Sequence, residues 1–269
     1  MYKIAEVIGE AAKLAPPGLA APWDNPGLLL GDVQKPCSAV LMALDLSLAV
    51  VAQAQELGCQ LILTHHPFIF AAQKQVLAGT YEGDLVLALA RAGIGAFAAH
   101  TNWDNANGGI NYALAEALGL QEPTPILDPN SGAGEILLLA GDLPRAAQGA
   151  ELLELVRNSL GLPLVRAAGL EPDKMYQRLA VVGGAGMDFW QEARAAGCDA
   201  LVSAEGKHHQ GVQAVQAGFC LVDATHFATE IMGIRRLGQL LGKELPDLQI
   251  FYAREQDGWA FYGRHGEQL

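Results

Sequence analysis

The sequence predicts an α/β protein made of two similar lobes. Short apolar runs of strand length alternate with amphipathic segments of helix length that end at glycines. The same order of elements returns later in the chain at a constant offset. Histidines and carboxylates follow the ends of the apolar runs in both halves. With 269 residues, the chain has room for one large domain or two modest ones.

The composition is that of a globular protein with a substantial core, because 51% of the residues are hydrophobic and only 17% are charged. The net charge of −12 and the pI near 4.9 argue against nucleic acid or an anionic membrane surface as a partner. The same charge is compatible with binding metal cations. A local basic patch would still suit a phosphate group.

The cysteines stand apart from one another, without a C-x-x-C pair, at Cys37, Cys59, Cys198 and Cys220. This spacing indicates neither a disulfide framework nor a thiolate zinc site, so we expect reduced, buried thiols. The N-terminal residues do not have the pattern of a signal peptide, and no apolar stretch reaches the roughly 18 residues that a membrane helix needs. We therefore expect a cytoplasmic protein without membrane contacts.

The first half begins with a predicted helix over residues 3–14, stopped by Pro16-Pro17-Gly18. A turn-rich loop follows at 23–29. Strands and glycine-terminated helices then alternate: strand Ser38–Leu44, helix Leu48–Leu57, strand Leu61–Thr64, helix Leu85–Ala92, strand Ile94–Ala99 and helix Ile110–Leu118.

The second half repeats this order at an offset of 139 residues, the distance from Val40 to Leu179. The repeated pieces are strand Leu179–Gly183, helix Met187–Ala196 and strand Ala200–Ser203, and strand Phe219–Val222 leads into His226 as Ile94–Ala99 leads into His100. An internal duplication explains this match, and chance similarity between two alanine-rich βαβ units is the alternative.

We assign residues 1–125 plus 223–269 to the first lobe and residues 126–222 to the second. The segment Gln121–Gly134 is rich in Pro, Asn, Ser and Gly, which is typical of a linker.

The pair His65-His66 is the most informative feature of the chain. It ends an apolar strand, and Pro67 holds His66 extended and stops the strand there. Ligands bind at this carboxyl edge in open α/β sheets. Because successive strand residues point to opposite faces, the two imidazoles suit two adjacent ions better than one. The alternative is an ordinary hydrogen-bonded histidine pair at a strand end.

Two further places carry metal-type side chains. His226 and Glu230 lie at i and i+4 on one helical face, where a carboxylate can bridge two cations, and Asp223 or Thr225 can cap that helix. Asp104 follows the strand that ends near His100. The alternatives are a helix-surface pair and a turn aspartate.

The segment Glu205-Gly206-Lys207-His208-His209 stands in the second lobe where His65-His66 stands in the first. It offers a general acid or base and a cation for a substrate phosphate, and a solvated turn is the alternative. Gly183-Gly184-Ala185-Gly186 joins a strand to a helix and is a weak signal for an anion site.

Together these residues supply imidazole and carboxylate ligands to one cleft expected between the lobes. We predict metal ligands at His65, His66, Asp104, His226 and Glu230. This ligand set suits Zn, Fe, Mn, Co or Ni better than Ca. The absence of cysteine ligands favours an open, catalytic type of site over a closed, structural one.

The chain resembles the NIF-three-like family, also known as GTP cyclohydrolase 1 type 2 homologues. The resemblance covers nearly the whole chain and rests on five motifs in the family's order: Trp23-Asp24-Asn25-x-Gly27-Leu28, Thr64-His65-His66-Pro67, His100-Thr101-Asn102-x-Asp104, Gly108-Gly109-Ile110-Asn111 and Asp223-Ala224-x-His226-x-x-x-Glu230. The sequence departs from the family at Glu205–His209, where His209 would match the family histidine and His208 replaces an aromatic residue.

The resemblance implies a dinuclear site with two divalent cations per chain. By motif, His66 and Asp104 would bind one cation, His65 and His226 the other, and Glu230 would bridge. It also implies a toroidal homohexamer. Longer members carry an extra domain inserted mid-chain, and this chain has no room for a full insert.

We therefore expect a metal-dependent hydrolase acting on a nucleotide-like small molecule such as GTP. His100 and His209 are the expected proton-transfer residues, and Thr101 and Lys207 the expected substrate contacts. A non-enzymatic metal-binding or metal-delivery protein would use the same ligands and is the alternative. A scaffold role of the assembled ring has no direct support in the sequence.

Overall fold

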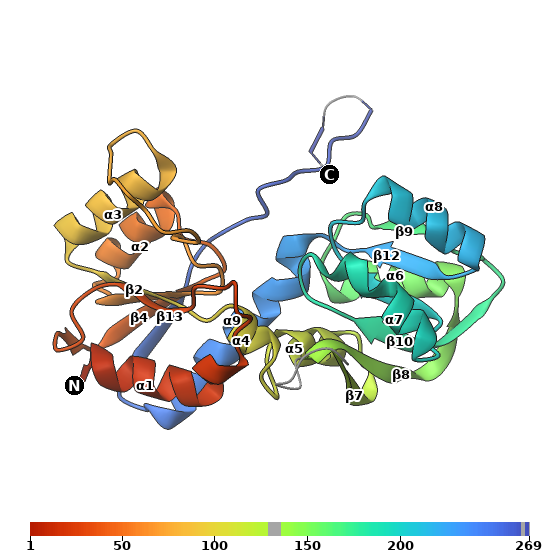
Figure 1. Ribbon diagram of the computed structural model, residues 1–269, viewed down its shortest axis with the longest axis horizontal. Helices are drawn as coiled ribbons and strands as arrows, with labels where there is room; N and C mark the ends of the chain where they lie inside the picture. The colour runs from red at the N-terminus through yellow and green to blue at the C-terminus, as the bar shows by residue number, and fades with distance from the viewer. Residues whose placement is uncertain (129–135, 265–266, 269) are drawn as a thin grey trace. The chain divides into compact units, whose positions relative to one another are not determined.

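The computed structural model describes residues 1–128, 136–264 and 267–268, and the chain divides into two compact units (Figure 1). The first unit comprises Met1–Gly109 and Ile234–Glu255, and the second comprises Ile110–Gly233 and Gln256–Leu269. These bounds differ from the lobes we expected from the sequence. Helix α5 (Ile110–Ala117) belongs to the second unit because its Leu114 and Ala115 are part of that unit's core.

The first unit contains a mixed sheet in the order β13-β4-β5-β6-β2, in which β13 to β6 are mutually parallel and β2 is antiparallel. The strands are β13 (Gln249–Tyr252), β4 (Ala39–Ala43), β5 (Leu61–Thr64), β6 (Gly95–Ala98) and β2 (Gly27–Leu30). A separate antiparallel pair joins β1 (Tyr2–Lys3) to β3 (Pro36–Cys37).

Helices cover both faces of this sheet. Leu41 and Ile62 pack with α2 and α3 in one apolar cluster, and Figure 1 shows α1 on the opposite side of the sheet. Gly238 lets α9 approach that second face, since a Cβ there would lie 3.0 Å from Met42 Cγ. The helices of this unit are α1 (Ile4–Leu14), the 3₁₀ helix η1 (Pro17–Leu19), α2 (Leu48–Glu56), α3 (Tyr81–Ala92), α4 (Thr101–Asp104) and the end of α9 (His226–Glu244).

The second unit is built on a sheet in the order β7-β8-β10-β11-β12-β9, with a parallel centre of β10, β11 and β12. One face packs against α5 and α6, and the other against α7 and α8. The strands are β7 (Gln121–Leu127), β8 (Ile136–Gln148), β9 (Arg166–Ala168), β10 (Met175–Val181), β11 (Ala200–Ser203) and β12 (Cys220–Asp223). The remaining helices are α6 (Gly149–Ser159), the 3₁₀ helix η2 (Gly186–Phe189), α7 (Trp190–Ala195) and α8 (His208–Ala217).

The parallel strands pair in the same register in both units. Val40 is opposite Leu61 in the first unit, and Leu179 is opposite Ala200 in the second, so both partners are displaced by 139 residues. This agreement fits the offset found in the sequence. The origin of the two units by duplication stays a prediction.

Most predicted elements are confirmed, including the strands Leu61–Thr64 and Ala200–Ser203 with the predicted bounds. Helix α3 begins earlier than predicted because the Thr80 hydroxyl accepts a hydrogen bond from Gly83 N. The linker predicted over 121–134 is wrong for Gln121–Leu127, which pairs with β8, and its residues 129–134 lie outside the described residues.

The cysteines are buried and carry free thiols, as predicted, and burial raises the pKa of each thiol to about 11. Within the described ranges, no helix is both long and apolar enough to cross a membrane.

Candidate metal centre

In the first unit, functional side chains follow the carboxyl ends of three parallel strands. Asp45 lies beyond β4, His65 and His66 follow β5 directly, and His100 lies beyond β6. Parallel strands end at the same edge of a sheet, so this topology gathers the side chains in one place. The sequence predicted this edge for His65 and His66.

His65 is the most deeply placed of these residues, with no exposed surface. Its Nδ1 lies 2.8 Å from the backbone carbonyl oxygen of Ala99. A carbonyl only accepts, so Nδ1 carries a hydrogen, and in the neutral ring the lone pair is on Nε2. The Nε2 atom lies 3.6 Å from Oδ1 of Asp104, on the short helix α4.

His66 is also held through Nδ1, but its partner is a carboxylate. Its Nδ1 lies 2.8 Å from Oδ1 of Asp45, and its backbone carbonyl accepts a 2.8 Å hydrogen bond from the Thr64 hydroxyl. The Asp45 backbone is fixed in turn by Glu255, whose carboxylate accepts hydrogen bonds from Leu44 N at 2.6 Å and from Asp45 N at 3.3 Å. Burial raises the pKa of Glu255, against the effect of these two hydrogen bonds.

His100 is oriented by Asp24, which has a fully buried side chain. Nδ1 of His100 lies 2.7 Å from Oδ1 of Asp24, while the backbone N–H and hydroxyl of Thr101 both donate to Oδ2. Burial opposes the ionisation of Asp24, but the hydrogen bonds from His100 and Thr101 outweigh it and lower the pKa of the carboxyl to about 2.

The three imidazoles form one cluster. One ring nitrogen each of His65, His66 and His100 lies within 4.8 Å of the others, a spacing that suits a shared metal ion. The ring centroids of His65 and His66 are 4.9 Å apart, because both residues lie beyond the last residue of β5 and escape the strict alternation of a strand. His100, which we expected to transfer protons, therefore lies beside the predicted ligands His65 and His66.

In the second unit, His226 and Glu230 lie on the first turns of α9. His226 Nε2 is 3.0 Å from Oε2 of the buried Glu230, and His226 Nδ1 is 2.7 Å from Oε1 of Glu205. Glu205 and Thr225 both have left-handed backbone conformations, with φ of +58° and +60°, which are unfavourable for a β-branched residue such as Thr225. The Thr225 hydroxyl accepts from Ala228 N at 3.4 Å and caps α9, as one of the two predicted options.

The glycine-rich loop after β10 packs against these two predicted ligands. A Cβ on Gly184, whose φ is +62°, would lie 2.2 Å from Oε1 of Glu230 and 3.0 Å from Nε2 of His226. The backbone N–H of Gly183 donates to Asn111 Oδ1 at 2.8 Å, and that of Gly184 donates to Thr229 Oγ1 at 3.0 Å. Because these two amides are used within the protein, they give no support to the anion site suggested by the sequence, and Gly184 instead leaves room for the predicted ligands.

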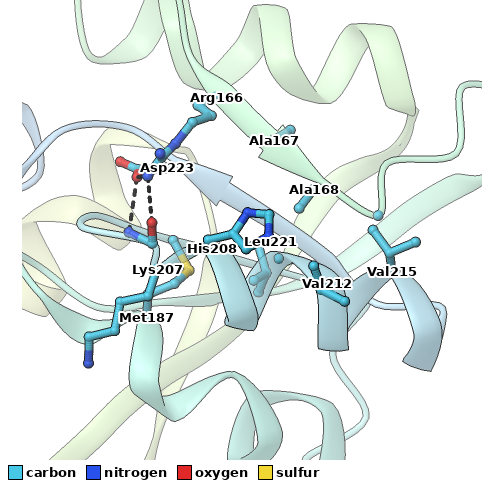
Figure 2. A pocket seen from close by; sticks show the side chains of 13 residues that line it. Arg166, Ala167, Ala168, Met187, Lys207, His208, Val212, Val215, Leu221 and Asp223 are labelled. Atoms are coloured by element: carbon cyan, nitrogen blue, oxygen red, sulfur yellow. Dashed lines mark hydrogen bonds and ion pairs between the residues drawn. The ribbon is translucent and has the colours of Figure 1, made fainter.

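The turn that carries Glu205 is fixed beside a cavity of about 550 Å³. Figure 2 shows Arg166 next to Asp223, and both contact Gly206: Arg166 donates to its carbonyl at 2.7 Å, and Asp223 accepts from its N–H at 3.1 Å. The walls of this cavity include apolar side chains of α8 and β12. Arg166 and Asp223 thus position the residue that holds His226.

The other predicted residues lie in less direct positions. The Thr101 hydroxyl is used inside the first unit, where it donates to Asp24 and accepts from Ala21 N. Lys207 lines the cavity, but its Nζ lies 2.9 Å from Oδ2 of Asp188. His209 is exposed on α8. The catalytic and substrate-binding roles of these residues and of His100 stay predictions.

The imidazoles of these two clusters share one arrangement, in which Nδ1 is directed to a protein oxygen. The acceptors are Ala99 O for His65, Asp45 for His66, Asp24 for His100 and Glu205 for His226. Metal-binding histidines typically have this arrangement, because the Nδ1 hydrogen bond fixes the tautomer and aims Nε2 at the ion. The donor set of neutral imidazole and carboxylate fits a divalent metal ion.

The orienting roles of the carboxylates Asp24, Asp45 and Glu205 were not predicted from the sequence. Asp24 stands in the quoted Trp-Asp-Asn motif, but no local pattern connects it with His100, 76 residues away. Asp45 and Glu205 each follow a predicted strand directly or within a few residues, at the same edge as the histidines. For Asp45, that position is a signal from which it could have been found, whereas Glu205 was expected only as part of a segment that offers a general acid or base.

The family model and the curated relatives that match this chain point to the same family. Residues 2–257 match the family model described as Duf34/NIF3 (NGG1p interacting factor 3). A relative in Clostridium perfringens, named GTP cyclohydrolase 1 type 2 homolog, is 29% identical over 94% of this chain and 97% of its own length. A Streptomyces coelicolor relative of the same name is 32% identical over 96% of this chain and 94% of its own length.

A solved structure of a hypothetical protein from Staphylococcus aureus has the same fold. It superimposes with a TM-score of 0.89 at 24% identity, over 96% of this chain and 99% of that chain. This likeness supports the mixed α/β fold.

Replacing Gly184 by alanine should damage the second unit's ligand pair. The new Cβ would collide with Glu230, in addition to the cost of a left-handed alanine, which is about 1–2 kcal/mol. We expect the free energy of unfolding, measured by urea denaturation, to fall by a further 1–3 kcal/mol or so relative to Gly197→Ala. Gly197 is the matched control, since its φ is +77° and nothing lies within 4 Å of its Cβ position. Equal losses in the two variants would contradict the collision.

Replacing Asp24 by asparagine should remove a pH-dependent contribution to stability. The folded pKa of about 2 lies below the usual value of 3.8, so the carboxylate stabilises the fold above about pH 4 and loses this effect as the pH falls towards 2. The free energy of unfolding should drop by about 2 kcal/mol at pH 7 and by about half as much at pH 3. Asp247→Asn, at an exposed position of the same unit, should change little. A pH-independent loss would speak against the carboxylate's charge as the cause.

Proposed function

Since the chain belongs to the Duf34/NIF3 family, we propose that it binds two divalent metal cations and is a metal-dependent hydrolase acting on a nucleotide-like substrate. One observation carries the metal part of this proposal. His65, His66 and His226 each have Nδ1 bound to a protein oxygen, which prepares Nε2 as a ligand atom. The same arrangement at all three predicted histidine ligands supports a metal site.

We propose that the two units contribute to one dinuclear centre, in the cleft expected between the lobes. His66 and Asp104 would bind one cation, His65 and His226 the other, and Glu230 would bridge. The ligand types, the burial of His65 and Glu230, and the family support this assignment. The identity of the metal is open among Zn, Fe, Mn, Co and Ni, since all of them accept imidazole and carboxylate.

When bound, the cations would lower the pKa of a coordinated water and polarise an electrophilic centre of the substrate. The chain's own side chains would orient the substrate and transfer protons to and from it. His100 would move a proton at Nε2, because Asp24 holds its Nδ1 and keeps the ring in one orientation. Thr101 fixes Asp24 and acts on the substrate side only through it. Lys207, and His209 with its exposed ring, would meet the more distant parts of the substrate.

A non-enzymatic metal-binding or metal-delivery role is the second candidate. The side chains of His66 and His226 are 25% and 33% exposed, so these ligands are open to an incoming metal acceptor. Transfer of bound metal to an apo-acceptor, followed by competition with a coloured chelator, separates the two roles. A delivery protein should transfer its metal within the assay, whereas a catalytic site should hold it through turnover.

The proposed dinuclear site predicts the metal content of the protein. After reconstitution, we expect about two metals per chain by mass spectrometry, and no more than about one in Glu230→Gln, because the bridging carboxylate is lost. Glu192→Gln, an exposed position on α7, is the matched control and should keep the wild-type content. A Glu230→Gln protein that retains two metals would refute the bridging role, and a wild-type chain that binds none would refute the site.

The proposed hydrolase activity predicts a reaction product. The relatives' name suggests GTP as the substrate. We propose that water opens its imidazole ring and that formate is released. The metal-loaded protein should release formate from GTP, and Glu230→Gln should reduce the rate at least 100-fold or so. Metal-loaded protein that yields no formate would remove GTP as the substrate and leave other nucleotide-like molecules to test.

We also propose self-association into a toroidal homohexamer. This assembly rests on the family alone. Light scattering of the purified protein tests it directly, and a monomer would contradict it.

A further inference from the structure

Two aromatic side chains stand exposed beside the imidazole cluster of the first unit. Trp23 is 62% exposed and Phe70 is 52% exposed. Large apolar rings are usually buried, so a pair that is more than half exposed at one place is a feature to explain. Neither residue has a role in the metal site proposed above.

Both rings lie against His100. The Trp23 and Phe70 centroids are 6.1 Å and 6.2 Å from the His100 ring, and both meet it nearly at right angles, at 75° and 76°. Since His100 belongs to the cluster with His65 and His66, a molecule that covers these rings would lie next to the candidate ligands.

The two rings are held in place by the residues next to them. Trp23 precedes Asp24, which binds His100 and Thr101. Asn25 donates from Nδ2 to the carbonyl of Ile69 at 2.6 Å, so the loop that carries Trp23 is tied to the residue before Phe70. Exposed side chains on a fixed backbone form a prepared surface, which lowers the entropic cost of binding.

The spacing of the rings decides how a ligand would bind. Their centroids are 5.8 Å apart with a 39° angle between the planes. A flat ring inserted between them would need about 7 Å, twice the contact distance of carbon atoms. Trp23 and Phe70 therefore fit a platform on which one ring stacks, and they do not fit a clamp that encloses it.

We propose that Trp23 and Phe70 bind the planar heteroaromatic ring, of nucleobase size, of the substrate and so help to determine its specificity. This inference rests on the proposed function, because it places the ring beside that metal site. Stacking does not require a cationic surface, which agrees with a chain whose net charge is −12.

The test follows the indole N–H resonance of Trp23, identified by its loss in Trp23→Leu, in two-dimensional NMR of the zinc-reconstituted protein. The probes are GMP and AMP, with ribose 5-phosphate as the matched compound that lacks the ring. We expect both nucleotides to shift the resonance in a saturable way and ribose 5-phosphate to leave it unchanged. Phe70→Leu should weaken nucleotide binding by about 5- to 100-fold, the usual effect of removing an aromatic stacking partner.

Trp259→Leu is the matched control, since Trp259 is 86% exposed elsewhere in the chain, and it should leave nucleotide binding unchanged. The proposal is overturned if millimolar nucleotides move the Trp23 resonance no more than ribose 5-phosphate does, or if Phe70→Leu binds them as the wild type does. It is also overturned if Trp23→Leu changes the oligomeric state instead, because the rings would then cover a protein interface.

Metal content is measured on the same samples, and the titration is repeated on metal-free protein. Wild-type metal content without ring-dependent binding would reject the platform and leave the metal site standing. If the wild-type chain takes up no metal on reconstitution but still shows ring-dependent binding, the proposed function is rejected and the platform stands.

Discussion

The hydrogen bond from Nδ1 of each imidazole is the interaction on which the candidate site depends. Without it, an imidazole chooses between two tautomers and rotates about its side-chain bonds, and the ligand atom has no fixed place. The acceptors are provided by the ends of strands or by loops beside them, so the parallel sheets fix the acceptors and the acceptors fix the rings. The chemistry of the site is thus a direct result of strand order.

Several carboxylates near the predicted ligands hold other residues in position. Asp24, Asp45 and Glu205 each hold one histidine, and Asp223 holds the turn before α8. A carboxylate that accepts hydrogen bonds is a stronger acceptor than a carbonyl, and it raises the basicity of the imidazole bound to it. His65 is the exception, since its partner is a backbone carbonyl, and it is also the most buried of the four.

The mixed α/β fold and the strand-end histidines could be predicted from the sequence, because apolar runs, glycine stops and His-His-Pro are local signals. Three kinds of feature could not. Strand β13 and edge strand β9 are short, and their pairing partners lie far away in the chain. Strand β7 was predicted as a linker because it is rich in proline and polar residues, which an edge strand tolerates. The Asp24–His100 and Glu255–Asp45 contacts span 76 and 210 residues, and no local pattern indicates such contacts.

The link between Glu255 and the end of β4 has a consequence for synthesis on the ribosome. Strand β4 and the first-unit histidines are made early, but their partner strand β13 and Glu255 follow only after the whole stretch 110–233. At ordinary translation rates this delay is on the order of ten seconds. During that time β4 is an unpaired edge of a nascent sheet, open to association with other chains. Most residues of the second unit are synthesised before the first unit is complete.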